Sequence, residues 1–266
     1  MVTFFLNYAS ASQIRRIGPE VLLNTTSYII LDARPKKIWQ SGHIPGAISI
    51  SWEDHTTVDE KNIPYRIPPV DKLALQLGAL GISDTSNVAV YGDADSSWGG
   101  EGWVCWLLTY LGHKGNICLM DGGISTWNES GYPVDQSIKK YEPVIYKSRV
   151  NNDVIITTQN LNASLKNIQF VDTRSTFEWF RGSIPGAVHI NWKKFFKGRD
   201  KKAINAAELK KMLEKNNIDP AKPVVYFCTG GIRSAYAWVV HDLAGFPTPK
   251  NYEGGMEAWK QQKKEK

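Results

Sequence analysis

Cysteine is scarce in this chain of 266 residues: there are three, an odd number at spacings that fit no disulfide framework. Structural disulfides are therefore not expected, and their absence favours a reducing compartment. Cys105 and Cys118 both lie within apolar runs, so we expect them to be inert core residues. Only Cys228 stands among glycines and beside an arginine.

Long apolar runs and dense positive charge are missing as well. No stretch of about 18 apolar residues is present that could span a bilayer. Residues 1–6 are apolar but carry no basic residue, which makes them a poor signal peptide. We therefore expect a cytoplasmic protein, or a periplasmic one if an upstream signal has been removed. The net charge of +6 is scattered except in the tail 260–266, so neither nucleic acid nor membrane is predicted as a partner, and small anions are favoured.

Short apolar runs alternate with helix-like segments along the chain. This alternation predicts an α/β fold in which a mainly parallel sheet is flanked by helices. Two of the predicted helices are closed by a glycine, as helix C-termini commonly are. The segments concerned are strands at 88–91, 117–120 and 224–226, helices at 73–80 and 103–110, and a short helix within 13–23.

The same order of motifs occurs twice, at a constant offset of 140 residues. An Asp-x-Arg turn follows a strand at residues 32–34 and again at 172–174. Gly-His-Ile-Pro-Gly-Ala then begins at Gly42, and Gly-Ser-Ile-Pro-Gly-Ala at Gly182. The chain is therefore predicted to hold two copies of one domain, with the organisation 1–135, a linker at 136–153, and 154–266.

The stretch around Cys228 has the properties of a nucleophile site. A buried strand ends there, and ligands of parallel sheets bind at that edge. Glycines let several N–H groups converge on an anion, and a helix N-terminus and an arginine add positive potential. We therefore expect the thiolate to prevail near neutral pH. The loop comprises Cys228, Thr229, Gly230, Gly231, Ile232, Arg233 and Ser234.

The first copy differs at this place. Aligning Tyr91 with Tyr226 puts Asp93 opposite Cys228, in a loop about two residues longer. Three carboxylates there, on Asp93, Asp95 and Glu101, would repel an anionic substrate. The first domain is therefore predicted to be catalytically silent and the second to be the catalytic one.

With these motifs the sequence resembles the tandem-domain rhodaneses, a family of sulfurtransferases, over nearly the whole chain. The motifs are the Asp-x-Arg turns, the two Pro-Gly-Ala turns, the Cys-x-x-Gly-x-Arg loop and the Gly-Gly-x-x-x-Trp ends. The resemblance implies transfer of a sulfane sulfur through a persulfide on Cys228, with no metal or cofactor. The donor would be a small anion such as thiosulfate, and the acceptor cyanide, a thiol or a protein cysteine.

The roles of the other charged residues are less defined. Arg233 has two open roles, either to bind the substrate anion or to pin the loop to an acid such as Glu178. Arg181 is a candidate for the mouth of the site, whereas Asp172 and Arg174 are expected to form a structural pair.

Substrate choice is predicted from departures from the family pattern. Mercaptopyruvate enzymes of this family usually carry arginine where this chain has Glu178, and a carboxylate there would repel mercaptopyruvate. Thiosulfate is therefore favoured and 3-mercaptopyruvate is the alternative. More distant alternatives are a phosphatase or arsenate reductase, whose loops have the spacing Cys-x5-Arg, and a non-catalytic persulfide-carrier or binding module.

Overall fold

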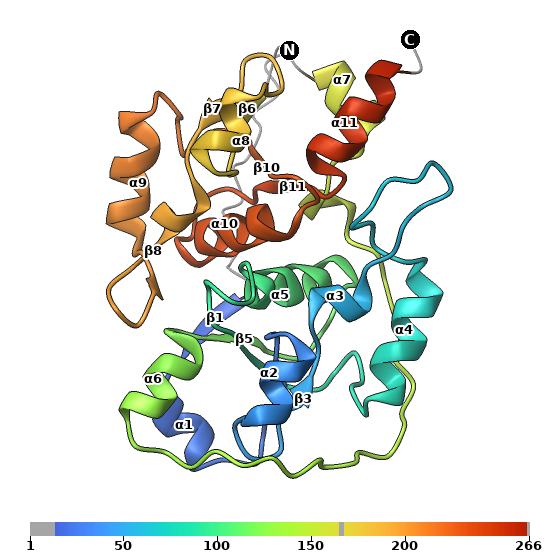
Figure 1. Ribbon diagram of the computed structural model, residues 1–266, viewed down its shortest axis with the longest axis vertical. Helices are drawn as coiled ribbons and strands as arrows, with labels where there is room; N and C mark the ends of the chain where they lie inside the picture. The colour runs from blue at the N-terminus through green and yellow to red at the C-terminus, as the bar shows by residue number, and fades with distance from the viewer. Residues whose placement is uncertain (1–13, 165–167, 265–266) are drawn as a thin grey trace, which may run out of the picture.

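The computed structural model describes residues 14–164 and 168–264, so the opening segment considered as a signal lies outside the described residues. The chain forms two α/β units that face each other across a pair of helices (Figure 1). Within the described part of the chain, no helix is long and apolar enough to cross a membrane.

The first unit contains a five-stranded sheet of order β1-β5-β4-β2-β3, in which every neighbouring pair is parallel. The strands are β1 (Ile14–Ile17), β2 (Ile29–Asp32), β3 (Ile48–Ser49), β4 (Val88–Tyr91) and β5 (Ile117–Met120). The helices are α1 (Pro19–Leu23), α2 (Lys36–Ser41), α3 (Trp52–His55), α4 (Val70–Ala79), α5 (Gly100–Tyr110) and α6 (Gly123–Glu129).

The second unit repeats this plan with a four-stranded parallel sheet of order β11-β10-β6-β7 and a small antiparallel pair, β8-β9. The strands are β6 (Gln169–Asp172), β7 (Val188–His189), β8 (Phe196–Lys197), β9 (Lys202–Ala203), β10 (Val224–Phe227) and β11 (Lys250–Tyr252). The helices are α7 (Thr158–Ser164), α8 (Thr176–Phe180), α9 (Ala206–Lys215), α10 (Ile232–Leu243) and α11 (Gly255–Lys264), with 3-10 turns η1 (Asn152–Val154) and η2 (Trp192–Phe195).

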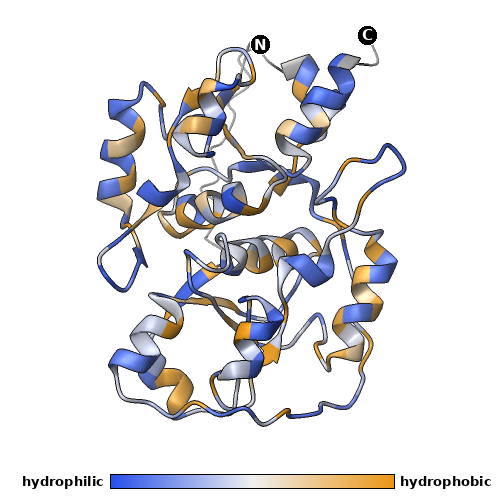
Figure 2. Cartoon of the chain, viewed as in Figure 1, coloured by the Kyte–Doolittle hydropathy of each residue, from blue (hydrophilic) through white to orange (hydrophobic). Residues whose placement is uncertain are grey.

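Burial explains why these segments form these elements. The central strands β4 and β10 are buried at every position, as continuous apolar runs in parallel sheets usually are. Helices α4 and α9 lie on the outside and mix hydrophobic with hydrophilic residues (Figure 2). Each turns a pair of leucines spaced four residues apart into the core, which are Leu73 and Leu77 in α4 and Leu209 and Leu213 in α9.

The short helix predicted within residues 13–23 is wrong in its first half. Ile14 and Ile17 are buried and the two arginines between them are exposed. This spacing fits one face of a helical turn, but it also occurs here in a strand at the edge of a sheet. Pairing with β5 decides the outcome, because all four residues of β1 lie in parallel register with β5 and the backbone groups on that side are satisfied. Only residues 19–23 form the helix, α1.

The predicted linker, residues 136–153, has no helix or strand before η1. It runs along the outside of the first unit (Figure 1). Hydrogen bonds fix its course, since the Tyr141 hydroxyl donates to the Gly46 carbonyl at 2.9 Å and the Val144 N–H donates to the Gly78 carbonyl at 2.9 Å. The exact domain boundaries stay a prediction.

Helices α5 and α10 form the centre of the interface between the units and lie side by side in Figure 1. A Cβ atom at Gly102 would lie 2.4 Å from the Cα of Tyr236, so the two backbones approach more closely there than any side chain allows. Trp192 is buried against Tyr236 and Gly99 at the same interface. Glycine therefore sets the distance between the units.

Candidate active site

Cys228 directly follows β10, at the carboxyl edge of the second sheet, and is 1% exposed. Its Sγ accepts a hydrogen bond from the Gly231 N–H at 3.2 Å and lies 3.6 Å from the Ser234 hydroxyl. Gly231 is the N-cap of α10 with φ +87°, and a Cβ there would lie 2.6 Å from the Glu253 carbonyl oxygen. The loop thus directs a backbone N–H and the N-terminus of a twelve-residue helix at the sulfur.

Asp172 and Arg174 form the structural pair that was expected beside this loop. The Arg174 guanidinium donates to both carboxylate oxygens of Asp172, at 2.9 and 2.6 Å, and Asp172 is fully buried. Arg174 also donates to the Gly182 carbonyl at 2.7 Å, and the Ser183 hydroxyl donates to Asp172 at 2.7 Å. The pair therefore ties the Pro-Gly-Ala turn to the end of β6.

Arg233 pins the loop to Glu178, which was one of its two open roles. The two guanidinium nitrogens donate to the two carboxylate oxygens at 2.7 and 2.8 Å. The Thr229 hydroxyl donates to Glu178 at 2.7 Å, and Ser175 completes a capping box with it at the start of α8. Burial alone would raise the pKa of Glu178, but these hydrogen bonds and the charge of Arg233 hold it well below its usual range.

A cavity of about 300 Å³ opens above the sulfur and is lined by both units. The second unit contributes loop residues and Glu178, and the first unit contributes three aromatic side chains that the sequence did not point to. The lining residues are Trp52, Tyr65, Trp98, Glu178, Cys228, Thr229, Gly230, Ile232 and Arg233. Trp52 was visible in the sequence only as the repeat of Trp192, and no sequence signal placed any of the three near Cys228.

The aromatic walls are held in defined positions. A Cβ at Gly230 would lie 2.5 Å from Tyr65, so this glycine permits Tyr65 to rest on the loop. Tyr65 itself adopts φ +64°, a conformation uncommon outside glycine, and packs edge-on against Trp52 at 5.8 Å. The Arg233 guanidinium lies 5.7 Å from the centre of the Trp98 ring.

A buried acid anchors the segment that carries Tyr65. The Ile67 N–H donates to Glu253 at 2.7 Å, and Arg66 forms an ion pair with the same carboxylate at 2.5 Å. Burial raises the pKa of Glu253 to about 7. Since the Glu253 backbone also lies against Gly231, this one residue connects the first unit to the loop around Cys228.

Arg181 is not among the residues that line the cavity, and its predicted place at the mouth of the site stays a prediction. Its exposed guanidinium stacks on the Phe177 ring at 4.4 Å, because residues four apart on a helix lie on one face. Among residues 14–164 and 168–264, no cluster of His, Cys, Asp and Glu side chains is arranged to hold a metal ion.

The corresponding place in the first unit is occupied by Gly92 and not by Asp93. The strand register pairs Tyr91 with Asp32 and Phe227 with Asp172, so the residue after each is equivalent. The carbonyls of Gly92 and Cys228 also accept the same hydrogen bond, from Ile124 and Met256 respectively. The predicted alignment was therefore displaced by one residue, because two tyrosines were matched that do not lie at the same strand position.

The loop of the first unit is also longer than predicted. Six residues separate Gly92 from the N-cap Gly99, against two between Cys228 and the N-cap Gly231. A Cβ at Gly92 would lie 2.2 Å from the Glu101 carboxylate, which thus fills the space of a cysteine side chain. Burial raises the pKa of Glu101 to about 7.

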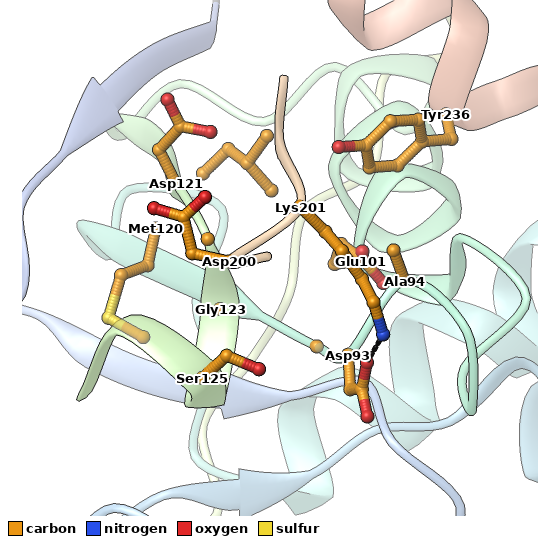
Figure 3. Close-up of a pocket in the computed structure, with 13 residues that line it drawn as sticks. Asp93, Ala94, Glu101, Met120, Asp121, Gly123, Ser125, Asp200, Lys201 and Tyr236 are labelled. Atoms are coloured by element: carbon orange, nitrogen blue, oxygen red, sulfur yellow. Dashed lines mark hydrogen bonds and ion pairs between the residues drawn. The ribbon is translucent and has the colours of Figure 1, made fainter. Parts of the chain in front are cut away.

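The other two carboxylates of this loop were expected to repel an anion, but both are bound in ion pairs. Lys201 of the second unit pairs with Asp93 at 3.1 Å and with Asp95 at 2.7 Å. Figure 3 shows Lys201 reaching down to Asp93 beside Glu101. Only about 10 Å³ of space remains, so steric filling rather than charge closes this site.

Comparison with known proteins supplies an independent line of observation. A family model described as Rhodanese-like domain matches residues 20–130 and again residues 157–262. Sulfur carrier protein TtuD of Thermus thermophilus is 28% identical over 249 residues, which cover 84% of each chain. Thiosulfate sulfurtransferase of Bos taurus is 26% identical over 270 residues, which cover 94% of this chain and 89% of that protein. The crystal structure of SseA from Escherichia coli, whose description refers to 3-mercaptopyruvate sulfotransferases, matches this chain with a TM-score of 0.81 at 19% identity. The match covers 90% of this chain and 98% of that one, which shows a shared fold.

Proposed function

Because the chain belongs to the rhodanese-like family, with two copies of the domain in tandem, we propose that it is a sulfurtransferase that acts through a persulfide on Cys228. In this proposal the sulfane sulfur comes from thiosulfate and passes to cyanide or a thiol. The observation that carries the proposal is the position of the Cys228 sulfur, which lies beneath a cavity, accepts a backbone N–H and faces a helix N-terminus.

The reaction has two steps. The Cys228 thiolate attacks the outer sulfur of thiosulfate, the S–S bond breaks, and sulfite leaves with the bonding electron pair. The product is the anionic persulfide, whose charge the loop N–H groups and the start of α10 can stabilise. Cyanide then attacks the outer sulfur, thiocyanate leaves, and the Cys228 thiolate is restored. The first domain takes no part in bond making and contributes the walls formed by Trp52, Tyr65 and Trp98.

Thiosulfate is favoured as donor by the charges of the cavity. Its lining has one acidic side chain, Glu178, and one basic side chain, Arg233, and these form an ion pair, so no lining cation is left to bind a separate carboxylate. Thiosulfate carries its outer sulfur and its charged oxygens in one compact group that the loop can reach as a whole. Mercaptopyruvate would have to place a separate carboxylate near Glu178, and the two negative charges would repel each other. Mercaptopyruvate is therefore the alternative donor.

Arg233 and Cys228 also bear on the two other candidate functions, a phosphatase and a persulfide carrier. A phosphatase would need its loop arginine for the oxyanion, but both terminal nitrogens of Arg233 donate to Glu178. A persulfide carrier that passes its sulfur only to another protein would use the same Cys228, and the similarity to a sulfur carrier protein favours it as the second candidate.

Mass spectrometry after incubation with thiosulfate tests the proposal. The protein should gain one sulfur atom, and cyanide should remove it as thiocyanate. Cys228→Ala should abolish the adduct, whereas Cys105→Ala and Cys118→Ala should keep it because neither of these thiols lines the cavity. An adduct that persists in the Cys228→Ala protein contradicts the proposal, and a parallel assay with mercaptopyruvate ranks the two donors.

A further inference from the structure

A second cavity, of about 800 Å³, opens in the first unit. It lies between α2, the edge strand β3, α3, the end of α4 and residues 138–141. None of the residues that line it also lines the cavity above Cys228. Sites for small molecules usually have volumes of about 300–1,000 Å³, so this cavity has room for a ligand of nucleotide size.

His55, the last residue of α3, lines this cavity and is 8% exposed. Its Nδ1–H donates to the Ser51 carbonyl at 2.9 Å. Burial lowers the pKa of His55, so the ring is neutral at pH 7 and its Nε2 carries a lone pair. Within residues 14–164 and 168–264, no group donates a hydrogen bond to that atom. His55 therefore offers the cavity an acceptor, and such an acceptor costs free energy unless a ligand or water donates to it.

The second unit shows that the fold does not need a polar side chain at this position. The segments α3 and η2 are equivalent, because they begin at Trp52 and Trp192 of the repeat and both end three residues later. The last residue of η2 is Phe195, which is fully buried. Phenylalanine avoids the cost of burying an imidazole, so packing alone does not account for His55.

Two further aromatic side chains line the cavity in fixed positions. Trp39 is buried, its Nε1–H donates to the Ala47 carbonyl at 3.0 Å, and its ring stacks on His43 at 4.5 Å. Tyr141 is held by the hydrogen bond from its hydroxyl to the Gly46 carbonyl. Rings that are already fixed lose little conformational freedom when a flat ligand packs against them.

Positive charge is in excess around this cavity. Three exposed lysines line it, Lys36, Lys139 and Lys140, together with one carboxylate, that of Asp54. In the described part of the chain none of these lysines forms an ion pair, and the Lys139 ammonium lies 4.8 Å from the centre of the Tyr141 ring. Three ammonium groups against one carboxylate favour a ligand with negative charge.

We propose that this cavity is a second ligand site, which binds a flat heteroaromatic anion through an N–H group at His55 and the negative group at the three lysines. The ring of the ligand would pack on Trp39 and Tyr141. A nucleoside monophosphate has all three features, since it combines a flat base, an N–H donor and a phosphate. The site shares no residue with the cavity above Cys228, so the proposal does not depend on the proposed function.

Calorimetric titration of the full chain with five such anions tests the proposal. The probes are AMP, GMP, CMP, UMP and indole-3-acetate, each of which combines a flat ring, an N–H donor and a negative group. At least one should bind with a dissociation constant on the order of 100 µM or tighter. Its uncharged counterpart, the nucleoside or indole-3-acetamide, should bind about tenfold more weakly, because it leaves the lysines without an anion.

Variants separate the two parts of the site. Lys139→Gln with Lys140→Gln should weaken the anion about tenfold and leave its uncharged counterpart unchanged. Lys210→Gln with Lys211→Gln is the control, because it removes the same charge from exposed positions of α9 and should leave binding as in the parent. His55→Phe introduces the residue of the second unit and should weaken the anion and its counterpart alike, about tenfold. His55→Gln keeps an acceptor and should weaken both less.

Three outcomes would overturn the proposal. If all five anions fail to bind at the expected level, the cavity is not a site for this class of ligand. Binding that the Lys139→Gln, Lys140→Gln protein retains in full would place the ligand elsewhere, and this variant decides the matter even where His55→Phe unfolds the protein, because both lysines are exposed. A bound anion that thiosulfate displaces would belong to the loop around Cys228.

Discussion

The Glu178 carboxylate accepts hydrogen bonds from three side chains, and through them it fixes the shape of the loop around Cys228. Arg233 and Thr229 both belong to that loop, and Ser175 fixes the start of α8. With its pKa held below the usual range, Glu178 stays ionised at every pH of ordinary use. Its pairing contributes stability at neutral pH that is lost only as the pH falls toward that low pKa, because protonation removes the charge that Arg233 binds.

Replacement of Glu178 should therefore change which donor is used. Glu178→Arg puts positive charge where a carboxylate of mercaptopyruvate would lie and should lower the ratio of thiosulfate to mercaptopyruvate kcat/KM at least about tenfold, equivalent to about 1.5 kcal/mol. Glu178→Gln keeps acceptor capacity toward Thr229 and should shift the ratio less. In the unaltered protein the ratio should be constant between about pH 5 and 9. A ratio that Glu178→Arg leaves unchanged would mean that this side chain does not face the substrate.

At the scale of the elements, the two strand-to-helix loops connect equivalent elements but place different groups at the end of the strand. Both leave a buried strand and enter a helix capped by a glycine with positive φ. In the second unit the short connection leaves the cysteine sulfur facing the helix N-terminus. In the first unit the longer connection brings the Glu101 carboxylate into the equivalent space. Loop length therefore decides which copy can hold a nucleophile.

A cysteine introduced into the first unit should stay inert. Gly92→Cys, made in the Cys228→Ala protein, places a side chain against Glu101 and should lower the unfolding free energy by about 1–3 kcal/mol through overpacking. No persulfide should form, because the loop does not direct its N–H groups at that position. Asp93→Cys should fail as well, since residue 93 lies one position beyond the strand end. Thiocyanate formation and intact mass after thiosulfate treatment measure both variants, and turnover near the parent level would contradict the steric account.

The order of strands and helices could be predicted because each element carries a local signal. Apolar runs marked β4 and β10, glycines marked helix ends, and the repeated Asp-x-Arg turns showed two copies. Local sequence signals failed where pairing with another strand decides the structure. Residues 14–17 form a strand because they pair with β5. Only the register between β2 and β4 shows that Gly92, and not Asp93, follows the strand end. The loop around Cys228 was predictable from sequence, whereas Trp52, Tyr65 and Trp98 reach it only through the packing of the two units.

At the scale of the whole molecule, the two units cover each other's sites in a reciprocal way. Asp121 and Glu253 precede equivalent Gly-Gly pairs and accept backbone N–H groups from the opposite unit, Ala203 at 2.8 Å and Ile67 at 2.7 Å. Lys201 lies over the first site and Tyr65 over the second. These contacts make the relative position of the units part of the active site.

Gly102→Ala should test how closely the units must approach. Gly102 lies in the first turn of α5, and alanine is intrinsically better than glycine by up to about 0.5–1 kcal/mol within a helix. The added Cβ would lie 2.4 Å from the Tyr236 Cα, a backbone atom that cannot move aside, so we expect a net loss of about 1–3 kcal/mol in urea unfolding and lower turnover. Gly18→Ala is the control, because its Cβ meets only the flexible end of Glu20. A Gly102→Ala protein as stable as the parent would show that the interface relaxes.

Trp52, Tyr65 and Trp98 belong to the unit whose strand-to-helix loop has Gly92 where the other has Cys228, and this bears on how the gene can change. After the duplication that the repeat records, the first copy could lose its nucleophile and still be needed for the walls around Cys228. Selection then acts on the two halves for different properties, on chemistry in one and on shape in the other. An inactivating mutation can therefore arise in either half of the gene, although only one half encodes the cysteine that we propose to carry the sulfur.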